Sequence, residues 1–313
     1  MSGVHRLILL LAAALIAGCA TPRDGTPKAG AVAPGVYVVR GSGGEAEPVN
    51  QGRIGNTGFI VGETGVVAID TGTSYRHGRE LLAAIAGVTD KPVRLAIVTH
   101  TRPEFLFGGN AFRERGIPIR MHRKAAQLMA ARCENCLKNL KRALGDEAMA
   151  GTTMYTPDQL FDATEVLDLI GRPLRVHYFG HSSGPGDVAV LDETSGVLFA
   201  GGLVDDRRVP DVHDGELAGW RDALATLRTL PVALVVPAHG APGKPGVIDL
   251  ELAYLTRLEA RVTQLLQGGA SLSEAPDAAG LSDYAGWDQY EIIHRRNASI
   301  VFVRLERELL FKQ

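Results

Sequence analysis

The sequence predicts an α/β protein, specifically a four-layer αββα sandwich in which two sheets pack face to face and helices cover their outer faces. Short runs rich in β-branched residues recur along the chain and end at turns, and helical patterns follow them. This order of strands and then helices occurs twice, once in each half of the chain. A single doubly wound sheet is the alternative architecture. No Gly-x-Gly-x-x-Gly or P-loop motif joins a strand to a helix, so nucleotide binding has no support.

The first half supplies five expected strands and three expected helices. The strands are expected at residues 36–40, 58–61, 66–69, 93–98 and 118–121. The helices are expected at residues 76–86, 104–115 and 122–144. In the second half, strands are expected at residues 174–178, 188–192, 197–200 and 233–236, and helices at residues 217–229, 247–267 and 289–310. Each half therefore holds enough strands for one sheet of the sandwich.

The composition describes a folded globule and argues against a nucleic-acid binder. The chain has 313 residues, of which 45% are hydrophobic and 22% are charged, which suffices for one large or two medium domains. Its 33 Lys and Arg residues nearly balance 35 Asp and Glu residues, for a net charge of -2. Proteins that bind nucleic acid carry a basic excess or stripe, so we expect no nucleic acid among the partners.

The N-terminus is typical of an exported bacterial protein. His5 and Arg6 precede an apolar run over residues 7–16, which is too short to span a bilayer of ~30 Å as a helix. The run is followed by small residues and ends at Cys19 in the order Ile-Ala-Gly-Cys, which resembles the lipobox of bacterial lipoproteins. In that motif the cysteine is lipidated and becomes the mature N-terminus. A plain secretory signal with an incidental cysteine is the alternative.

Three segments are therefore expected along the chain. Residues 1–19 are a lipoprotein-type signal peptide, and residues 20–34, rich in Pro, Gly, Ala and Thr, are a flexible tether. Residues 35–313 are a single domain with C-terminal helices. The mature protein is expected in the bacterial periplasm, anchored to a membrane by a lipid on Cys19.

Cys133 and Cys136 form a Cys-x-x-Cys pair within the expected helix over residues 122–144. An exported chain meets an oxidising environment in which disulfides persist, and a spacing of three places both side chains on one helix face. We expect a local disulfide, with a redox role or two free thiols as alternatives. A structural zinc site needs four ligands, and a c-type haem attachment site needs a histidine directly after the second cysteine, so neither applies.

Three histidines lie just after expected strands, beside small residues. They are His100, His181 in the loop before residues 188–192, and His239 in the order Pro-Ala-His-Gly. Loops at strand ends are where a rigid scaffold presents functional groups. Taken singly, each would more often be an ordinary core or surface histidine. Their shared context makes them the candidate site residues.

In these loops the chain resembles the metallo-β-lactamase superfamily. The matching segments, in the family's order, are Gly65-Val66-Val67-Ala68-Ile69-Asp70-Thr71-Gly72, the His100 loop running to Gly108-Gly109-Asn110, the His181 loop ending Pro185-Gly186-Asp187, Leu198-Phe199-Ala200-Gly201, and Val235-Val236-Pro237-Ala238-His239-Gly240. Together they cover about residues 34–265. The resemblance implies the αββα sandwich and hydrolysis by a zinc-activated water in a cleft at the sheet edges.

A narrower likeness comes from the ends of the chain. The lipobox, the cysteine pair and the order His-Arg-Arg-Asn at residues 294–297 are similar to the exported quinoprotein relay system zinc metallohydrolases. That branch accompanies periplasmic dehydrogenases and sulfur-oxidation systems. The likeness implies a periplasmic oxidoreductase as a partner.

The metal motif departs from the family. The pattern His-x-His-x-Asp-His falls on residues 100–105, where only His100 is kept. Arg102 replaces the second histidine, Glu104 the aspartate and Phe105 the third histidine. Arginine cannot ligate a metal because its guanidinium stays protonated. Phe105 either packs with its apolar neighbours or lines the cleft.

The other matched positions keep part of the ligand set. His181 and His239 stand where the family has histidines, but the bridging aspartate falls on Gly202. Asp205 and Asp206 follow closely and offer replacement carboxylates. Asp70 resembles the aspartate that orients the histidine loop, although a turn-capping role explains it nearly as well.

Two arrangements are compatible with this partial set. In the first, a single zinc or other first-row divalent ion activates a water, with Glu104 and Asp205 as the catalytic carboxylates. Its candidate ligands are His100, His181, His239, Asp205 and Asp206. In the second, no metal binds, and Arg102 supplies the positive charge, pairs with Glu104 or Asp205, and binds an anionic ligand such as a carboxylate, sulfate or phosphate.

Two functions follow from the two arrangements. The first is an exported metallohydrolase with an altered site, acting on an ester, thioester or amide of a small molecule. The second is a non-catalytic binding or accessory lipoprotein of a periplasmic quinoprotein or sulfur-oxidation system. The retained histidines favour the first function, and Arg102 with Phe105 favours the second.

Overall fold

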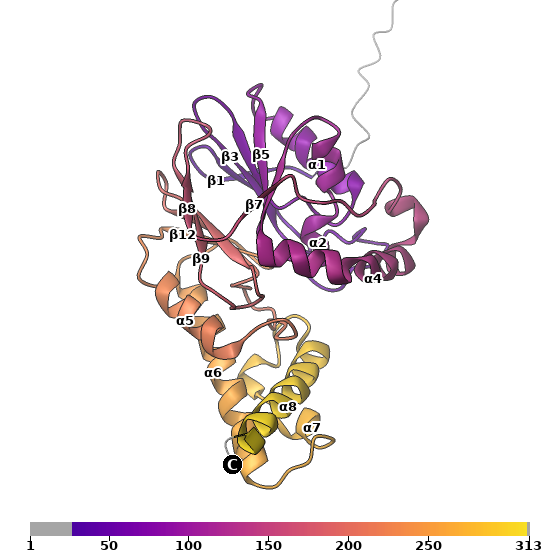
Figure 1. Ribbon diagram of the computed structural model, residues 1–313, viewed down its shortest axis with the longest axis vertical. Coiled ribbons are helices and arrows are strands. Elements are labelled where there is room, and N and C mark those ends of the chain that lie inside the picture. Colours follow the sequence, from indigo (N-terminus) through magenta and orange to yellow (C-terminus); the bar gives the residue numbers. More distant parts are fainter. Residues whose placement is uncertain (1–26, 312–313) are drawn as a thin grey trace, which may run out of the picture.

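The computed structural model describes residues 27–311, so the expected signal peptide and Cys19 lie outside the described residues. Twelve strands form two sheets within this range (Figure 1). The first sheet has the order β1 (Gly30–Ala33), β2 (Val36–Val39), β3 (Thr57–Val61), β4 (Val66–Ile69), β5 (Val93–Val98), β6 (Ile119–His122) and β7 (Gln159–Phe161). The second has the order β12 (Leu234–Pro237), β11 (Val197–Gly201), β10 (Val188–Asp192), β9 (Leu174–Tyr178) and β8 (Glu165–Leu167).

Each sheet is mixed, with its parallel pairs at one side. The strands from β4 to β7 are parallel, whereas β1 to β4 form antiparallel pairs. In the second sheet only β11 and β12 are parallel. Parallel neighbours place their carboxyl ends at the same sheet edge. The segments after β4 and β5, and those after β11 and β12, are therefore neighbours, and these four segments build the candidate site.

The two sheets pack face to face through one apolar layer. Alternate residues of the first sheet, such as Val67 and Ile69, join alternate residues of the second, such as Val188 and Val190, in one buried cluster. The intervening side chains point the other way, as the two-residue period of a strand requires. Val66 and Ala68, for example, belong to a separate cluster with the helices. This confirms the four-layer sandwich, and the single doubly wound sheet is wrong.

The helices form the two outer layers. The first sheet is covered by α1 (Tyr75–Ala86), α3 (Gly109–Arg113) and α4 (Arg123–Ala148). The second is covered by α5 (Leu217–Leu227), α6 (Gly246–Gln267) and α8 (Arg295–Phe311). Short elements complete the chain: α2 (Pro103–Leu106), α7 (Ala275–Ala278), the single turn η1 (Ser282–Tyr284) and the π-helix η2 (Tyr290–His294). In Figure 1 the lower part of α6, α7 and α8 extends away from the sandwich as a helical lobe.

Three local expectations were wrong. The tether over residues 20–34 includes β1, because Gly30 and Ala31 pair with β2 and add an edge strand to the first sheet. The expected helix over residues 104–115 is divided into α2 and α3. The carbonyl of Phe105 accepts hydrogen bonds from the backbone of Thr71 and Gly72 instead of continuing the helix. The strands β7 and β8 were not expected from the sequence.

Within residues 27–311, no helix is long and apolar enough to cross a membrane.

Candidate functional site

The site lies where the carboxyl ends of β4, β5, β11 and β12 meet. Asp70 follows β4, His100 follows β5, Asp205 follows β11 and His239 follows β12. Each of these four side chains is at most 4% exposed, so the site is a buried polar cluster between two apolar layers. Buried polar groups are stable only when they are paired, so their partners define the chemistry of the site.

A chain of hydrogen bonds orients His100. Thr99 donates its backbone N–H to Asp70 Oδ1 over 2.8 Å, and its hydroxyl donates to Asp70 Oδ2 over 2.9 Å. Burial raises the pKa of Asp70 to about 7, and above that pH the single proton of the hydroxyl goes to the Asp70 carboxylate, so the hydroxyl accepts from His100 Nδ1, which lies 2.7 Å away. The tautomer of His100 therefore carries its proton on Nδ1. Its Nε2 is buried and has no hydrogen-bond partner.

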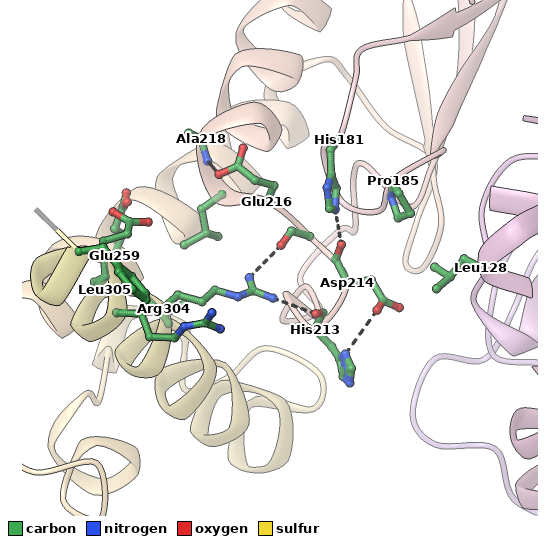
Figure 2. Close-up of a pocket in the computed structure, with 16 residues that line it drawn as sticks. Leu128, His181, Pro185, His213, Asp214, Glu216, Ala218, Glu259, Arg304 and Leu305 are labelled. Carbon is green, nitrogen blue, oxygen red and sulfur yellow. Dashed lines mark hydrogen bonds and ion pairs between the residues drawn. The ribbon is translucent and has the colours of Figure 1, made fainter. Parts of the chain in front are cut away.

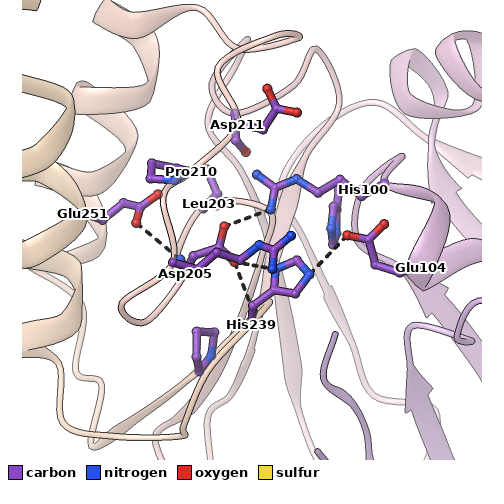
Figure 3. A network of polar contacts seen from close by, with 12 residues as sticks. His100, Glu104, Leu203, Asp205, Pro210, Asp211, His239 and Glu251 are labelled. Carbon is purple, nitrogen blue, oxygen red and sulfur yellow. Dashed lines mark hydrogen bonds and ion pairs between the residues drawn. The ribbon is translucent and has the colours of Figure 1, made fainter. Parts of the chain in front are cut away.

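A second network joins two cations and two carboxylates (Figure 3). Arg102 Nη1 donates to Asp205 Oδ2 over 2.9 Å. His239 contacts a carboxylate through each ring nitrogen: Nδ1 lies 2.8 Å from Asp205 Oδ1, and Nε2 lies 3.1 Å from Glu104 Oε1. The backbone N–H of His239 also donates to Asp205 Oδ1, over 3.0 Å. Arg102 therefore occupies the family's second histidine position as an ion-pair partner.

The two histidines differ in charge. Burial, reinforced by the nearby Arg102 guanidinium, lowers the pKa of His100 to about 3, so His100 is neutral. Burial also opposes the charged form of His239, but Asp205 and Glu104 outweigh it and raise the pKa of His239. Burial would raise the pKa of Glu104, yet the hydrogen bond from His239 and the two neighbouring cations lower it to about 2. The second network is therefore a set of ionised groups.

Phe105 fills the space between the two histidines. Its fully buried ring lies 4.3 Å from the His100 ring and 5.3 Å from the His239 ring, measured between centroids. The ring also lies directly against Gly55, where an added Cβ would come within 2.2 Å of Phe105 Cζ. Of the two alternatives for Phe105, packing against its neighbours is therefore the one observed. A glycine at position 55 is needed to make room for the ring.

Two of the expected metal ligands lie elsewhere. His181 is exposed, and its Nε2 is 2.7 Å from the carbonyl of Asp214 in a different loop. Asp206 is occupied differently, because its Oδ2 accepts a hydrogen bond from the backbone N–H of Ala241. Gly202, which holds the family's aspartate position, has no room for a side chain, because a Cβ would lie 2.8 Å from Asp187 Oδ2.

The residues present do not fit a zinc ion. Among residues 27–311, no group of three or more His, Cys, Asp or Glu side chains is arranged to hold a metal. Both ring nitrogens of His239 are engaged with carboxylates, and the Arg102 guanidinium neutralises Asp205. Of His100 and His239, the first presents a free nitrogen and the second does not. The expected ligand set of three histidines with Asp205 and Asp206 is therefore not brought together.

The expected disulfide is also absent. Cys133 is a buried thiol and Cys136 a half-buried one, both on α4. Residues three apart on a helix have Cβ atoms about 5–6 Å apart, whereas a disulfide needs about 3.5–4.5 Å. The Cys136 sulfur instead contacts the carbonyl of Arg132, at 3.7 Å. Both thiols are free, and a hydrogen bond between them raises the pKa of Cys133 and lowers that of Cys136 to about 7.

A cavity of about 320 Å³ opens over the ionised network. Three arginines line it, namely Arg102, Arg208 and Arg296, together with Glu104 and His239. The Nη2 atom of Arg102 is buried and has no hydrogen-bond partner. Isoleucine side chains of η2 form an apolar part of the wall. The cavity therefore suits a small ligand that has an anionic group and an apolar part.

Sequence reasoning did not assign Arg208 or Arg296 to the site. Arg208 donates to Asp288 Oδ2 over 2.6 Å and to the carbonyl of Gly44 over 2.8 Å. Arg296 at the start of α8 pairs with Asp211 over 2.6 Å. Arg296 belongs to the His-Arg-Arg-Asn order at residues 294–297, but that order did not place it in the cavity, and no motif marked Arg208. Both reach the cavity from segments that are distant along the chain, so only the fold brings them there.

Comparison with known proteins agrees with the fold. The sequence profile described as the Metallo-beta-lactamase superfamily matches residues 50–239, more than half of the chain. The chain belongs to the metallo-β-lactamase superfamily, and its fold is that of a hydrolase family. The resemblance inferred from the sequence motifs is confirmed.

Two similar proteins add detail. The linear primary-alkylsulfatase of Pseudomonas sp. (strain ATCC 19151) is 24% identical over 218 residues, which is 59% of this chain and 41% of the alkylsulfatase. The match thus spans well under half of that relative. A metallo-beta-lactamase from Pontibacter korlensis superposes with a TM-score of 0.61 at 22% identity, covering 73% of this chain and 98% of its own. At this identity the second likeness shows the fold alone.

Proposed function

We propose that this protein binds a small organic anion in the Arg102 cavity and does so without a metal. The observation that carries the proposal is the Arg102–Asp205 ion pair, which sets a guanidinium where the family has a metal ligand. The Arg102 side chain is 20% exposed and lines the cavity, so its guanidinium is available to a ligand carboxylate or sulfate.

The chemistry of the cavity supports an anion over a cation. Arg102, Arg208, Arg296 and the protonated His239 supply four positive groups to the lining, against the three carboxylates of Glu45, Glu104 and Asp211. A ligand carboxylate or sulfate can share these donors in bidentate fashion, as guanidinium groups favour. The alkylsulfatase relative is named for a sulfate ester, which is an anion of this class.

The same geometry offers no means of activating water as the family does. An activated water on zinc needs three protein ligands beside it, and His239 has no free lone pair. Glu104 and Asp205, the expected catalytic carboxylates, both lie in ion pairs with lowered pKa values, which makes them poor bases. The accessory, non-catalytic alternative is the proposed function.

The location and partner are proposed from the sequence. The signal-like residues 1–19 and Cys19 support a lipoprotein of the bacterial periplasm. The likeness to the quinoprotein relay branch supports a periplasmic oxidoreductase as the partner. An anion-binding accessory protein anchored at the membrane is compatible with both.

Calorimetric titration with sulfate and with malonate, at constant ionic strength, tests the binding proposal. We expect binding by the parent and at least tenfold weaker binding by Arg102→Lys, because lysine loses the bidentate geometry. Arg296→Gln should also weaken binding. Arg113→Gln is the matched control, because Arg113 forms a surface pair with Asp158 away from the cavity.

Elemental analysis of the same samples separates the two functions. The proposal expects no stoichiometric zinc, iron or manganese after incubation with each ion. One metal per chain that is lost in the double variant His100→Ala with His239→Ala would overturn it. The proposal would also be contradicted if neither sulfate nor malonate binds to the parent or to the Arg113→Gln control.

A further inference from the structure

A second, separate groove lies between the helical lobe and the sandwich. Its volume is about 830 Å³, and it shares no lining residue with the Arg102 cavity. Figure 2 shows its walls: α8 on one side, the 213–218 segment with the start of α5 on the other, and Leu128 of α4 at one end. Nothing in the proposed anion site uses this groove.

The groove combines an apolar lining with charges of both signs. Leu128, Leu217 and Leu305 supply apolar surface from three different helices. Glu259 of α6 and Arg307 of α8 add opposite charges. The carboxylate of Glu259 pairs with Arg221, so the groove has no single dominant sign. Such a wall fits an amphipathic segment that carries both charges better than it fits a simple anion or cation.

The walls are held in place before any partner arrives. Arg304 of α8 donates to the carbonyl of Gly215 over 2.8 Å and to that of His213 over 2.9 Å. Asp214 in the same loop forms an ion pair with Arg132 of α4, and its carbonyl contacts His181 Nε2. A preformed groove costs little ordering entropy when it is filled.

The end of α8 has the chemistry that the groove fits. Leu309, Leu310 and Phe311 are 49%, 65% and 82% exposed, an unusual run of large apolar side chains on a surface. The residues before them alternate arginine and glutamate. Phe311 itself lies at the rim of the groove, so the apolar end and the groove are adjacent.

We propose that the groove is the docking site for α8 of a second copy of this chain. Because the groove runs along α8, a twofold axis across α8 would place the two helices side by side and antiparallel. Each copy would then lay its mixed-charge, apolar helix end into the groove of the other. The contact is isologous, so it closes at two copies and buries both exposed ends.

Sedimentation analysis of the parent across the micromolar to submillimolar range gives the first test. We expect a reversible dimer. Leu310→Glu places a charge on the exposed helix end, and Ala218→Trp fills the groove at an exposed position. Each change should weaken the dimer at least tenfold. Leu272→Glu, at a leucine 44% exposed and outside the groove, is the matched control and should leave the dimer unchanged.

Mixing the two weakened variants tests directly whether the helix end of one copy lies in the groove of the other. A mixed pair keeps one intact contact, formed by the native helix end of the Ala218→Trp copy in the open groove of the Leu310→Glu copy. The other contact of the mixed pair carries both changes, but a contact already broken by one change loses little more from the second, whereas each variant alone has two broken contacts. The mixture should therefore associate more tightly than either variant.

Thermal melts check that the variants fold, and Leu128→Glu replaces Ala218→Trp if the tryptophan prevents folding. A parent that stays monomeric throughout the range would overturn the proposal. So would a dimer that the control weakens as much as the variants do, or a mixture that associates no better than its parts.

Discussion

His100 and His239 stand in similar places and carry different charges. Each follows a strand at the same edge of the sandwich, and each is 1% exposed. His239 touches two carboxylates directly, whereas His100 reaches Asp70 only through the hydroxyl of Thr99. Arg102 further disfavours a charge on His100. The number of carboxylates in direct contact decides the charge, because burial alone would neutralise both histidines.

The same difference shows what remains of a metal site. A histidine ligand must be neutral and must direct a free nitrogen at the metal. His100 meets both conditions, since its pKa is about 3 and its Nε2 has no partner. His239 meets neither. The site is therefore divided into one half that keeps the ligand chemistry and one half that has become an ion-pair network.

Removing Arg102, which sets the two histidines apart, should have the largest effect on stability. Arg102→Met leaves Asp205 with His239 as its remaining cationic contact and takes the neighbouring charge away from His100. Breaking a buried ion pair by removing one partner costs about 3–5 kcal/mol. Denaturant unfolding should show a loss of this size. Arg296→Met, which breaks the more exposed pair with Asp211, should cost about 0–1 kcal/mol, and equal losses would contradict the assignment.

The ring that separates the two histidines can be tested through Gly55. Gly55→Ala forces a Cβ into the Phe105 ring and should cost about 1–3 kcal/mol, as overpacking does. Phe105→Leu should relieve most of that cost, so the double variant should be more stable than the sum of the two changes predicts. Additive losses in a double-mutant cycle would show that the contact is not the cause.

The hydroxyl of Thr99 links Asp70 to His100 through hydrogen bonds. Its loss should lower the free energy of unfolding by less than the two changes above. Thr99→Val keeps the shape and removes hydrogen bonds to both neighbours, at a cost of about 1 kcal/mol. The ¹⁵N shifts of the imidazole should then report loss of the Nδ1–H tautomer preference at His100. His239 should keep its shifts in this variant, because Thr99 does not contact it. A change at His239 of the same size would show a general disturbance.

The two histidines should also give opposite slopes in the pH dependence of stability. The folded-state pKa of His100 is about 3, against ~6.5 in the unfolded chain, so the unfolded chain binds an extra proton between these values. Stability should fall as pH decreases from about 6.5, and His100→Asn should flatten that slope. For His239 the folded pKa is raised, so its contribution is present below about 6.5 and is lost as pH rises through the folded pKa.

Denaturant unfolding from about pH 4 to about pH 9 measures both slopes. His239→Asn should flatten the alkaline side only. The comparison is between each variant and the parent, because Asp70 and Asp187, whose pKa values burial raises, contribute to the parent curve as well. Flattening on the opposite side by either variant would reverse the charge assignment.

Much of the fold could be predicted because its signals are local. The apolar runs that became β4, β5, β10 and β11 are buried on both faces, and such strands read as continuous β-branched segments. The short strands β7 and β8 lack that signal, because they hold only three residues each and are partly exposed. β1 lies in a segment whose composition suits a tether, and only its pairing with β2 makes it a strand.

The site was predicted less completely, for a different reason. The motif positions placed Asp70, His100, Arg102, Asp205 and His239 together, since the parallel strand ends bring them to one edge. His181 failed because its direction depends on the loop that holds Asp214, which no motif describes. The pairing of Arg102 with Asp205 was one of two alternatives, and only the geometry of the network decides between them.

Two close contacts limit which single substitutions this site can accept. Phe105 fits against Gly55, and Gly202 is crowded by Asp187. Restoring a histidine at position 105 or an aspartate at position 202 alone would leave a void beside Gly55 or push a side chain into Asp187. Either change alone would therefore be destabilising. The family's ligands can be accommodated at positions 105 and 202 only together with compensating substitutions at the residues that these side chains would meet.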